Sequence, residues 1–177
     1  ISLTSKTKVG FTAGLTASFP ISKDFSFRPG LNYIQKGGKQ DQEGSTDNLT
    51  LNYIELPLNF VFNTSTSKGM FFIGAGPSFN IGLSGKDKWD DGSESGSDDI
   101  KFGSGADADF KPFEAGINIL AGYQFASGFF VAANYNAALN NIAPDDPEFD
   151  TKYHNRYFGI RIGYMFGGKT KTSTESK

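Results

Sequence analysis

Seven segments of the chain alternate apolar and polar residues with a period of two. Successive side chains of a β-strand point to opposite faces, so each segment is predicted to be a strand with one apolar and one polar face. The segments cover residues 9–19, 25–33, 49–63, 71–83, 113–125, 129–139 and 158–166. The pattern predicts an all-β protein.

The two faces carry residues that a water-soluble sheet would not place there. Strand glycines fall on the polar face together with Ser, Thr and Asn, and lysines lie only in connections or at strand margins. Small side chains suit the crowded interior of a narrow barrel, whereas a wide apolar face with aromatic residues near strand ends suits lipid. We therefore expect an antiparallel up-and-down transmembrane β-barrel over residues 1–166. A soluble barrel of lipocalin type would need the opposite arrangement.

The connections between the segments alternate between short and long. The short ones cover residues 20–24, 64–69 and 126–128, and the long ones cover residues 37–48, 84–111 and 141–152. Outer-membrane barrels have short periplasmic turns and longer outer loops. We therefore expect extracellular long loops, a periplasmic C-terminus and a polar, disordered periplasmic tail over residues 167–177.

The number of predicted strands is odd, whereas bacterial single-chain barrels have even numbers. An open sheet of seven strands would also expose unpaired backbone groups to lipid. The first predicted strand runs from the outer side to the periplasmic side. We therefore expect an eighth, ascending strand, either upstream in the same polypeptide or supplied by something else.

Composition excludes several functional classes. The 177 residues fit one domain, the net charge of −2 gives no basic surface for nucleic acid, and the absence of cysteine rules out thiolate metal sites and disulfides. Aromatic residues reach 15%, with 22 glycines, and no apolar stretch is long enough for a membrane helix. A basic-then-apolar signal peptide is also lacking at the start of the sequence.

Four charged residues fall on predicted interior faces: Arg28, Glu55, Glu114 and Arg161. Two acids and two bases in a confined space predict interior ion pairs, because an unpaired buried charge is costly. A gate or a polar relay is one interpretation. A structural plug is the favoured one, because the interior of an eight-stranded barrel is only wide enough for side chains.

No pattern of catalytic, cofactor-binding or metal-binding residues emerges, and we expect no enzyme activity. His154 is the single histidine, and it is predicted with Arg156 at the outer interface, where Glu114 could approach it. The connection 84–111 is acidic, and its spacing between Asp87 and Gly92 is similar to a calcium loop except that Trp89 occupies a ligand position. A solvated acidic loop is the favoured interpretation, and contact with lipopolysaccharide through divalent ions is a further one.

Several motifs resemble PorT-like outer-membrane barrels. Segment 51–58, Leu-Asn-Tyr-Ile-Glu-Leu-Pro-Leu, resembles that family's Tyr-Leu-Glu-Ile-Pro-Leu signature, and segments 11–15, 72–77, 155–159 and 163–166 carry weaker glycine-containing matches. In that family the first strand is usually of Gly-x-x-x-Gly-x-Asn type, which this chain lacks. Phe166 resembles the terminal aromatic residue that the barrel-assembly machinery reads.

The resemblance implies a small porin-like protein in the cell outer membrane of a Gram-negative bacterium. Its expected role is that of a structural or accessory subunit of a secretion or assembly complex of the envelope. Expected partners are outer-membrane lipid, lipopolysaccharide, the barrel-assembly machinery and other outer-membrane proteins, with no nucleic acid. The alternative is a free-standing surface barrel that binds a ligand or an adhesion partner through the acidic loop 84–111. A solute channel is disfavoured by the small number of strands.

Overall fold

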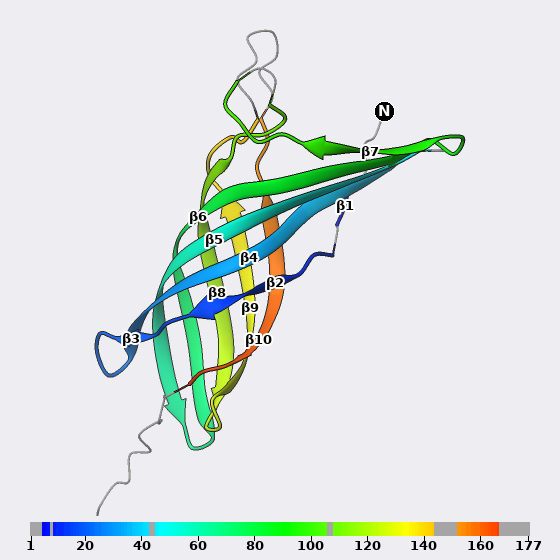
Figure 1. The fold of residues 1–177 in the computed structure, drawn as a ribbon. Coiled ribbons are helices and arrows are strands. Elements are labelled where there is room, and N and C mark those ends of the chain that lie inside the picture. The colour runs from blue at the N-terminus through cyan, green and yellow to red at the C-terminus, as the bar shows by residue number, and fades with distance from the viewer. Residues whose placement is uncertain (1–4, 8, 43–44, 106–107, 144–151, 167–177) are drawn as a thin grey trace, which may run out of the picture.

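The computed structural model shows one antiparallel sheet that curls into a half-barrel (Figure 1). It describes residues 5–7, 9–42, 45–105, 108–143 and 152–166. The strands are β1 (Ser5–Thr7), β2 (Thr12–Thr16), β3 (Phe19–Pro20), β4 (Phe25–Gln42), β5 (Ser45–Thr66), β6 (Gly69–Asp90), β7 (Ser95–Ile100), β8 (Phe113–Phe125), β9 (Phe129–Ala138) and β10 (Arg156–Tyr164). The predicted tail over residues 167–177 lies outside the described residues.

The strands follow one another around the sheet in the order of the sequence. β1, β2 and β3 all pair with β4, and the order then continues through β5, β6, β8 and β9 to β10, with every pairing antiparallel. From β4 to β10, apart from β7, which pairs with β6, successive strands are therefore neighbours in the sheet, as in an up-and-down barrel. The predicted fold class is confirmed, and each of the seven predicted segments contributes residues to the curved part of this sheet, which we call the wall. In the part of the chain that the structure describes, no helix is long and apolar enough to cross a membrane.

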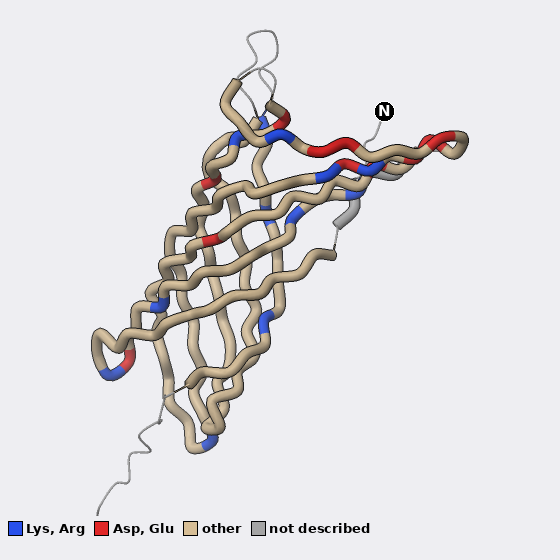
Figure 2. Tube along the Cα trace, viewed as in Figure 1, with Lys and Arg blue, Asp and Glu red and all other residues tan. Residues whose placement is uncertain are grey.

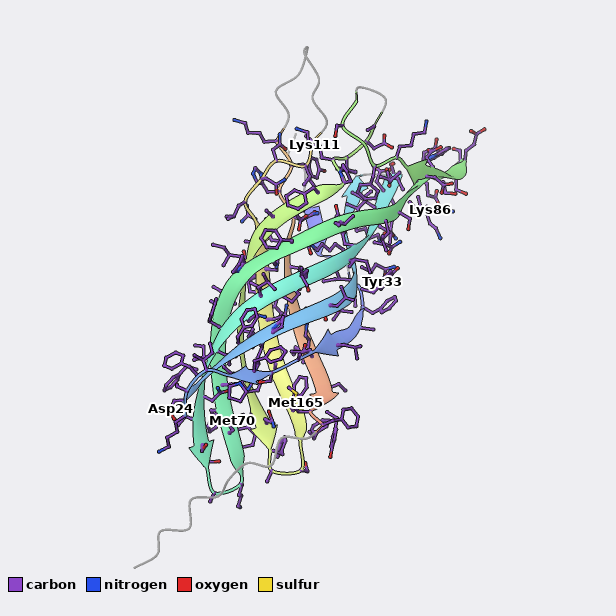
Figure 3. All side chains as sticks on the ribbon, turned by 60° about the vertical axis from the view of Figure 1, so that its left-hand side comes forward. Asp24, Tyr33, Met70, Lys86, Lys111 and Met165 are labelled. Atoms are coloured by element: carbon purple, nitrogen blue, oxygen red, sulfur yellow. The ribbon has the colours of Figure 1, made fainter. Side chains whose placement is uncertain are left out.

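The two ends of the half-barrel differ in their connections. Residues 21–24, 67–68 and 126–128 form tight turns at one end, the short-turn end, and Gly128 has a φ of +95°, which favours glycine. The opposite end, the long-connection end, carries the longer segments. Figure 3 shows Asp24, Met70 and Met165 at the short-turn end and Lys86 and Lys111 at the long-connection end.

The prediction of long loops over residues 37–48 and 84–111 is wrong in part, because strands continue into both segments. β4 and β5 pair as far as Gln42 and Ser45, and β6 pairs with β7 up to Asp90 and Ser95. These strands leave the wall and form the projecting sheet, which we define as residues 34–42, 45–53, 82–90 and 95–100 (Figure 1). Its pairing uses backbone hydrogen bonds, and both faces of much of it carry polar residues. The sequence there lacks the apolar alternation on which the prediction depended.

A small apolar cluster joins the projecting sheet to the mouth of the half-barrel. Ile34, Leu51 and Tyr53 are buried together, and Phe102 and Phe110 pack against them from the connection that follows β7. The Phe102 ring lies edge-on to Tyr53 at 5.7 Å, and a Cβ on Gly82 would lie 2.5 Å from the Phe102 ring. Part of the connection 84–111 is thus packed on the barrel mouth and is not solely a solvated loop.

Candidate functional site: the polar interior

The side chains are distributed inside-out relative to a water-soluble protein. Large apolar residues on the convex face are exposed, for example Phe60, Ile73 and Ile119, at 57%, 57% and 48%. Asn, Ser, Glu and Arg side chains on the concave face are buried. Figure 2 shows that charged residues gather at the two ends and are sparse along the wall. Such a surface is stable only where an apolar medium surrounds the wall.

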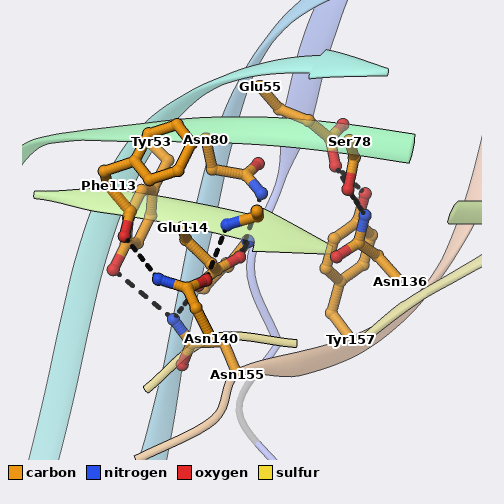
Figure 4. A network of polar contacts seen from close by, with 12 residues as sticks. Tyr53, Glu55, Ser78, Asn80, Phe113, Glu114, Asn136, Asn140, Asn155 and Tyr157 are labelled. Carbon is orange, nitrogen blue, oxygen red and sulfur yellow. Dashed lines mark hydrogen bonds and ion pairs between the residues drawn. The ribbon is translucent and has the colours of Figure 1, made fainter. Parts of the chain in front are cut away.

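Glu55 lies at the centre of the first interior cluster. Its side chain is fully buried and accepts hydrogen bonds from Tyr157 Oη at 2.5 Å and Arg161 Nη2 at 3.0 Å. Asn32 and Asn136 donate to the same carboxylate at 2.9 and 3.4 Å. The donors come from β4, β9 and β10, whereas Glu55 is on β5, so the cluster ties opposite sides of the curved sheet together across the interior (Figure 4).

Glu114 lies at the centre of a second cluster, nearer the long-connection end. Lys36 Nζ forms an ion pair with its carboxylate at 2.5 Å, and both side chains are buried. Asn80 and Asn155 donate to the same carboxylate at 3.0 and 2.7 Å (Figure 4). Lys36 also lies 4.9 Å from the centre of the Tyr53 ring. Each carboxylate thus has a cation and amide donors, as buried charges require.

Arg28 is near the short-turn end and has a different environment. Its guanidinium donates to Asn63 Oδ1 at 2.7 Å and to Ser26 Oγ at 3.3 Å, and it lies 4.8 Å from the centre of the Phe72 ring. The side chain is buried. Among the described residues, the structure records no carboxylate partner for Arg28.

The four predicted interior residues are therefore brought together only in part. Glu55 and Arg161 form an ion pair, whereas the cation on Glu114 is Lys36, which the sequence analysis treated as part of a strand margin. The alternation of the strand could have identified Lys36. Every second residue of β4 points inward, and Lys36 has the same even spacing as the inward residues Arg28 and Asn32. The alternation was followed only to Tyr33, because the polar segment that comes next hides it.

The two residues predicted at the outer interface are exposed and do not face the polar interior. His154 and Arg156 are exposed at the start of β10, next to the long-connection end. Glu114 is buried with Lys36, Asn80 and Asn155 as its partners, so the predicted approach of His154 to Glu114 is not seen in the described part of the chain.

Two carboxylates of the acidic connection accept backbone hydrogen bonds in the turn between β6 and β7. Asp91 Oδ1 accepts hydrogen bonds from the backbone N–H groups of Glu94 at 2.7 Å and Ser93 at 2.9 Å, and Asp90 accepts one from Gly92 N–H at 2.8 Å. Within the described residues, no group of three or more His, Cys, Asp or Glu side chains could hold a metal ion. The spacing similar to a calcium loop therefore corresponds to a turn that these side chains stabilise.

The Asp91 turn gives a prediction for pH dependence. The N–H groups of Glu94 and then Ser93 hold the pKa of the Asp91 carboxyl below its ordinary value. A lowered pKa means that the stabilisation is complete above the ordinary value and is lost as the pH falls through the lowered one. NMR of the chain in micelles should show the Ser93 and Glu94 amide shifts titrating below the ordinary aspartate range. Asp91→Asn should abolish that titration, and a midpoint at or above the ordinary value would contradict the turn geometry.

An antiparallel curved sheet with an apolar exterior and a buried polar interior defines a transmembrane β-barrel protein. The comparison with protein families agrees, because the model of the outer membrane protein beta-barrel domain matches residues 2–143. The chain belongs to that family and is an outer-membrane protein. No curated protein and no solved structure matched the chain.

Proposed function

We propose that the protein is a structural or accessory barrel of the envelope whose interior is closed to solutes. The observation that carries this proposal is the filling of the interior by side chains from opposite walls. Glu55 on β5 reaches Arg161 on β10, and Glu114 on β8 reaches Lys36 on β4. Charged side chains that neutralise one another across the interior stabilise the wall, and they support a barrel that obstructs solutes at the level of these two pairs.

The setting of this barrel is also part of the proposal. The long-connection end and the projecting sheet face the outside of a Gram-negative cell, and the C-terminus faces the periplasm, as loop lengths in such barrels favour. The resemblance of segment 51–58 to PorT-like barrels supports a role as a subunit of a secretion or assembly complex. The partners are lipid, lipopolysaccharide, the barrel-assembly machinery and other outer-membrane proteins. No enzymatic activity is proposed.

Two measurements test this function. In planar bilayers the purified protein should give no steady conductance, whereas a solute channel would give regular steps. After mild-detergent extraction from native outer membranes, native sizing should show an assembly larger than one barrel, with co-purifying proteins. Migration alone at the size of a single small barrel would contradict the role as a subunit and leave a free-standing barrel.

One observation favours a second function, the binding of a ligand or an adhesion partner through residues 84–111. The hairpin of β6 and β7 extends beyond the wall and exposes Asp98 and Asp99 on β7, and its turn exposes Asp91 and Glu94. Replacing residues 86–99 with a short turn tests this function, because the wall does not use them. If whole cells lose binding to a partner while the barrel remains folded, the projecting hairpin is the binding surface. Unchanged binding would exclude it.

A further inference from the structure

A polar chamber lies inside the short-turn half of the half-barrel. Its volume is about 1420 Å³, and its lining includes Met70 and Met165, which Figure 3 shows at the short-turn end. Asn32 and Arg161, which donate to Glu55, also line it. The chamber therefore extends from the Glu55 cluster to the short-turn end.

The charges in this chamber are not balanced. Among the described residues, the lining contains Lys23, Arg28 and Arg161 but no carboxylate. Arg161 pairs with Glu55, whereas the structure records no carboxylate partner for Arg28, which is only 6% exposed. The acid nearest to Arg28 in the sequence, Asp24, is exposed in the turn and is not part of the lining. Because a buried cation without an anion is costly, the chamber favours a negatively charged occupant.

The surroundings of Arg28 hold its guanidinium in place with neutral groups. Arg28 donates to Asn63 Oδ1 at 2.7 Å and to Ser26 Oγ at 3.3 Å, and it lies 4.8 Å from the centre of the Phe72 ring. A Cβ on Gly122 would lie 2.5 Å from the Phe72 ring, so the glycine leaves room for this ring. The two recorded hydrogen bonds use only part of the five N–H donors of a guanidinium. Donors therefore remain for a further acceptor in the chamber.

Gln124 supplies a second donor to the same chamber. It lines the chamber and is 5% exposed, and within the described residues no hydrogen bond of its side chain is recorded. It lies two residues after Gly122 on β8, on the same face of the strand. Ser65 and Lys23 add a hydroxyl and an ammonium group to the lining.

These groups belong to the continuous part of the wall. Arg28 is on β4, Asn63 on β5, Phe72 on β6 and Gln124 on β8, and these four strands are consecutive neighbours in the sheet. The site therefore does not depend on the two edges of the sheet, β2 and β10.

We propose that Arg28 and Gln124 bind the phosphate group of a ligand that enters the chamber from the short-turn end. The planar guanidinium matches the geometry of a phosphate, which offers at least three acceptor oxygens to the surrounding donors. A carboxylate has two oxygens and would use fewer of these donors. A phospholipid headgroup and a small soluble phosphate compound share this chemistry. The site goes beyond the proposed role in an envelope complex and is independent of it.

A titration with inorganic phosphate tests the site on the whole chain. An uncharged maltoside detergent keeps the protein in solution without adding a phosphate group. NMR should show saturable shifts of the Gln124 side-chain amide and the Arg28 guanidinium. Arg28→Gln should bind phosphate at least about ten-fold more weakly, since a hydrogen bond to a charged group contributes that much. Equal affinity of Arg28→Gln and the wild type, or the absence of saturable shifts, would overturn the proposal.

A matched control and a second variant keep this test independent of folding defects. Arg156→Gln removes an exposed arginine at the long-connection end and should bind phosphate like the wild type. Gln124→Leu keeps Arg28 and should weaken binding several-fold. Phosphate should raise the Tm of the wild type above that in chloride of equal ionic strength, because a ligand of the folded state stabilises it. No such rise in the wild type, or wild-type affinity of Gln124→Leu, would contradict the assigned site.

Two further probes identify the source and the class of the anion. Short-chain phosphatidylglycerol that binds more tightly than inorganic phosphate would support a lipid headgroup as the natural occupant. Tighter binding of inorganic phosphate would support a soluble phosphate compound. Acetate should bind more weakly than both, and acetate that binds as tightly as phosphate would overturn the assignment to phosphate.

Discussion

Replacing Glu55 by alanine should lower the free energy of unfolding by about 3–5 kcal/mol. Glu55 is fully buried, and the Arg161 side chain that pairs with it is only 20% exposed, so the substitution leaves a cation with little access to water. The hydroxyl of Tyr157 and the amide of Asn32 lose their acceptor at the same time. Urea or thermal unfolding in micelles measures the loss, followed by the shift of the folded form on gels.

Two variants separate the buried charge from other effects. Glu55→Gln keeps the shape and an acceptor oxygen, so its loss should be smaller than that of Glu55→Ala. Glu94→Ala removes an exposed carboxylate from the turn after β6 and should change stability by less than about 0.5 kcal/mol. Conductance should stay unchanged in Glu55→Ala, because the Glu114 cluster and the residues around Arg28 remain in place. Wild-type stability of Glu55→Ala would show that the cluster does not hold the wall, and a large rise in conductance would favour a gate.

Placing arginine at Ile119 should destabilise the barrel in lipid vesicles by about 2–4 kcal/mol. Ile119 points outward from β8, and it lies between Ala75 on β6 and Tyr135 on β9 in the register. It is 48% exposed, so the new side chain has room and the loss arises from placing a charge in hydrocarbon. Unfolding by denaturant in vesicles measures the effect.

The control for this substitution lies on the projecting sheet. Ser97 is exposed on β7, outside the wall, and Ser97→Arg should cost no more than about 0.5 kcal/mol. Ile119→Ala measures the loss of the isoleucine contacts without a charge. If Ile119→Arg and Ser97→Arg were equally stable, water would surround the wall, and the assignment of the convex face to lipid would be wrong.

The spanning part of the fold was predictable because each wall strand separates two media. Lipid outside and a polar interior impose the period of two, so the facing of Glu55, Asn59 and Glu114 follows from the sequence. The odd number of strands predicted from the sequence also corresponds to the open side of the half-barrel. No comparable signal exists where both faces meet water, and the continuation of β6 through residues 84–90 was therefore missed.

The partners within the interior depended on the tertiary structure. The alternation along a strand assigns each side chain to one face of the sheet. The curvature of the sheet decides which of these side chains meet across the interior. Lys36 reaches Glu114 although they are 78 residues apart in sequence. Among the described residues, the recorded partners of Arg28 are the Asn63 amide, the Ser26 hydroxyl and the Phe72 ring. The sequence by itself thus determined the class, the wall strands and the inside-out surface. The ion pairs, the projecting sheet and the polar chamber were decided by tertiary structure, because they depend on strand curvature and on contacts between residues distant in sequence.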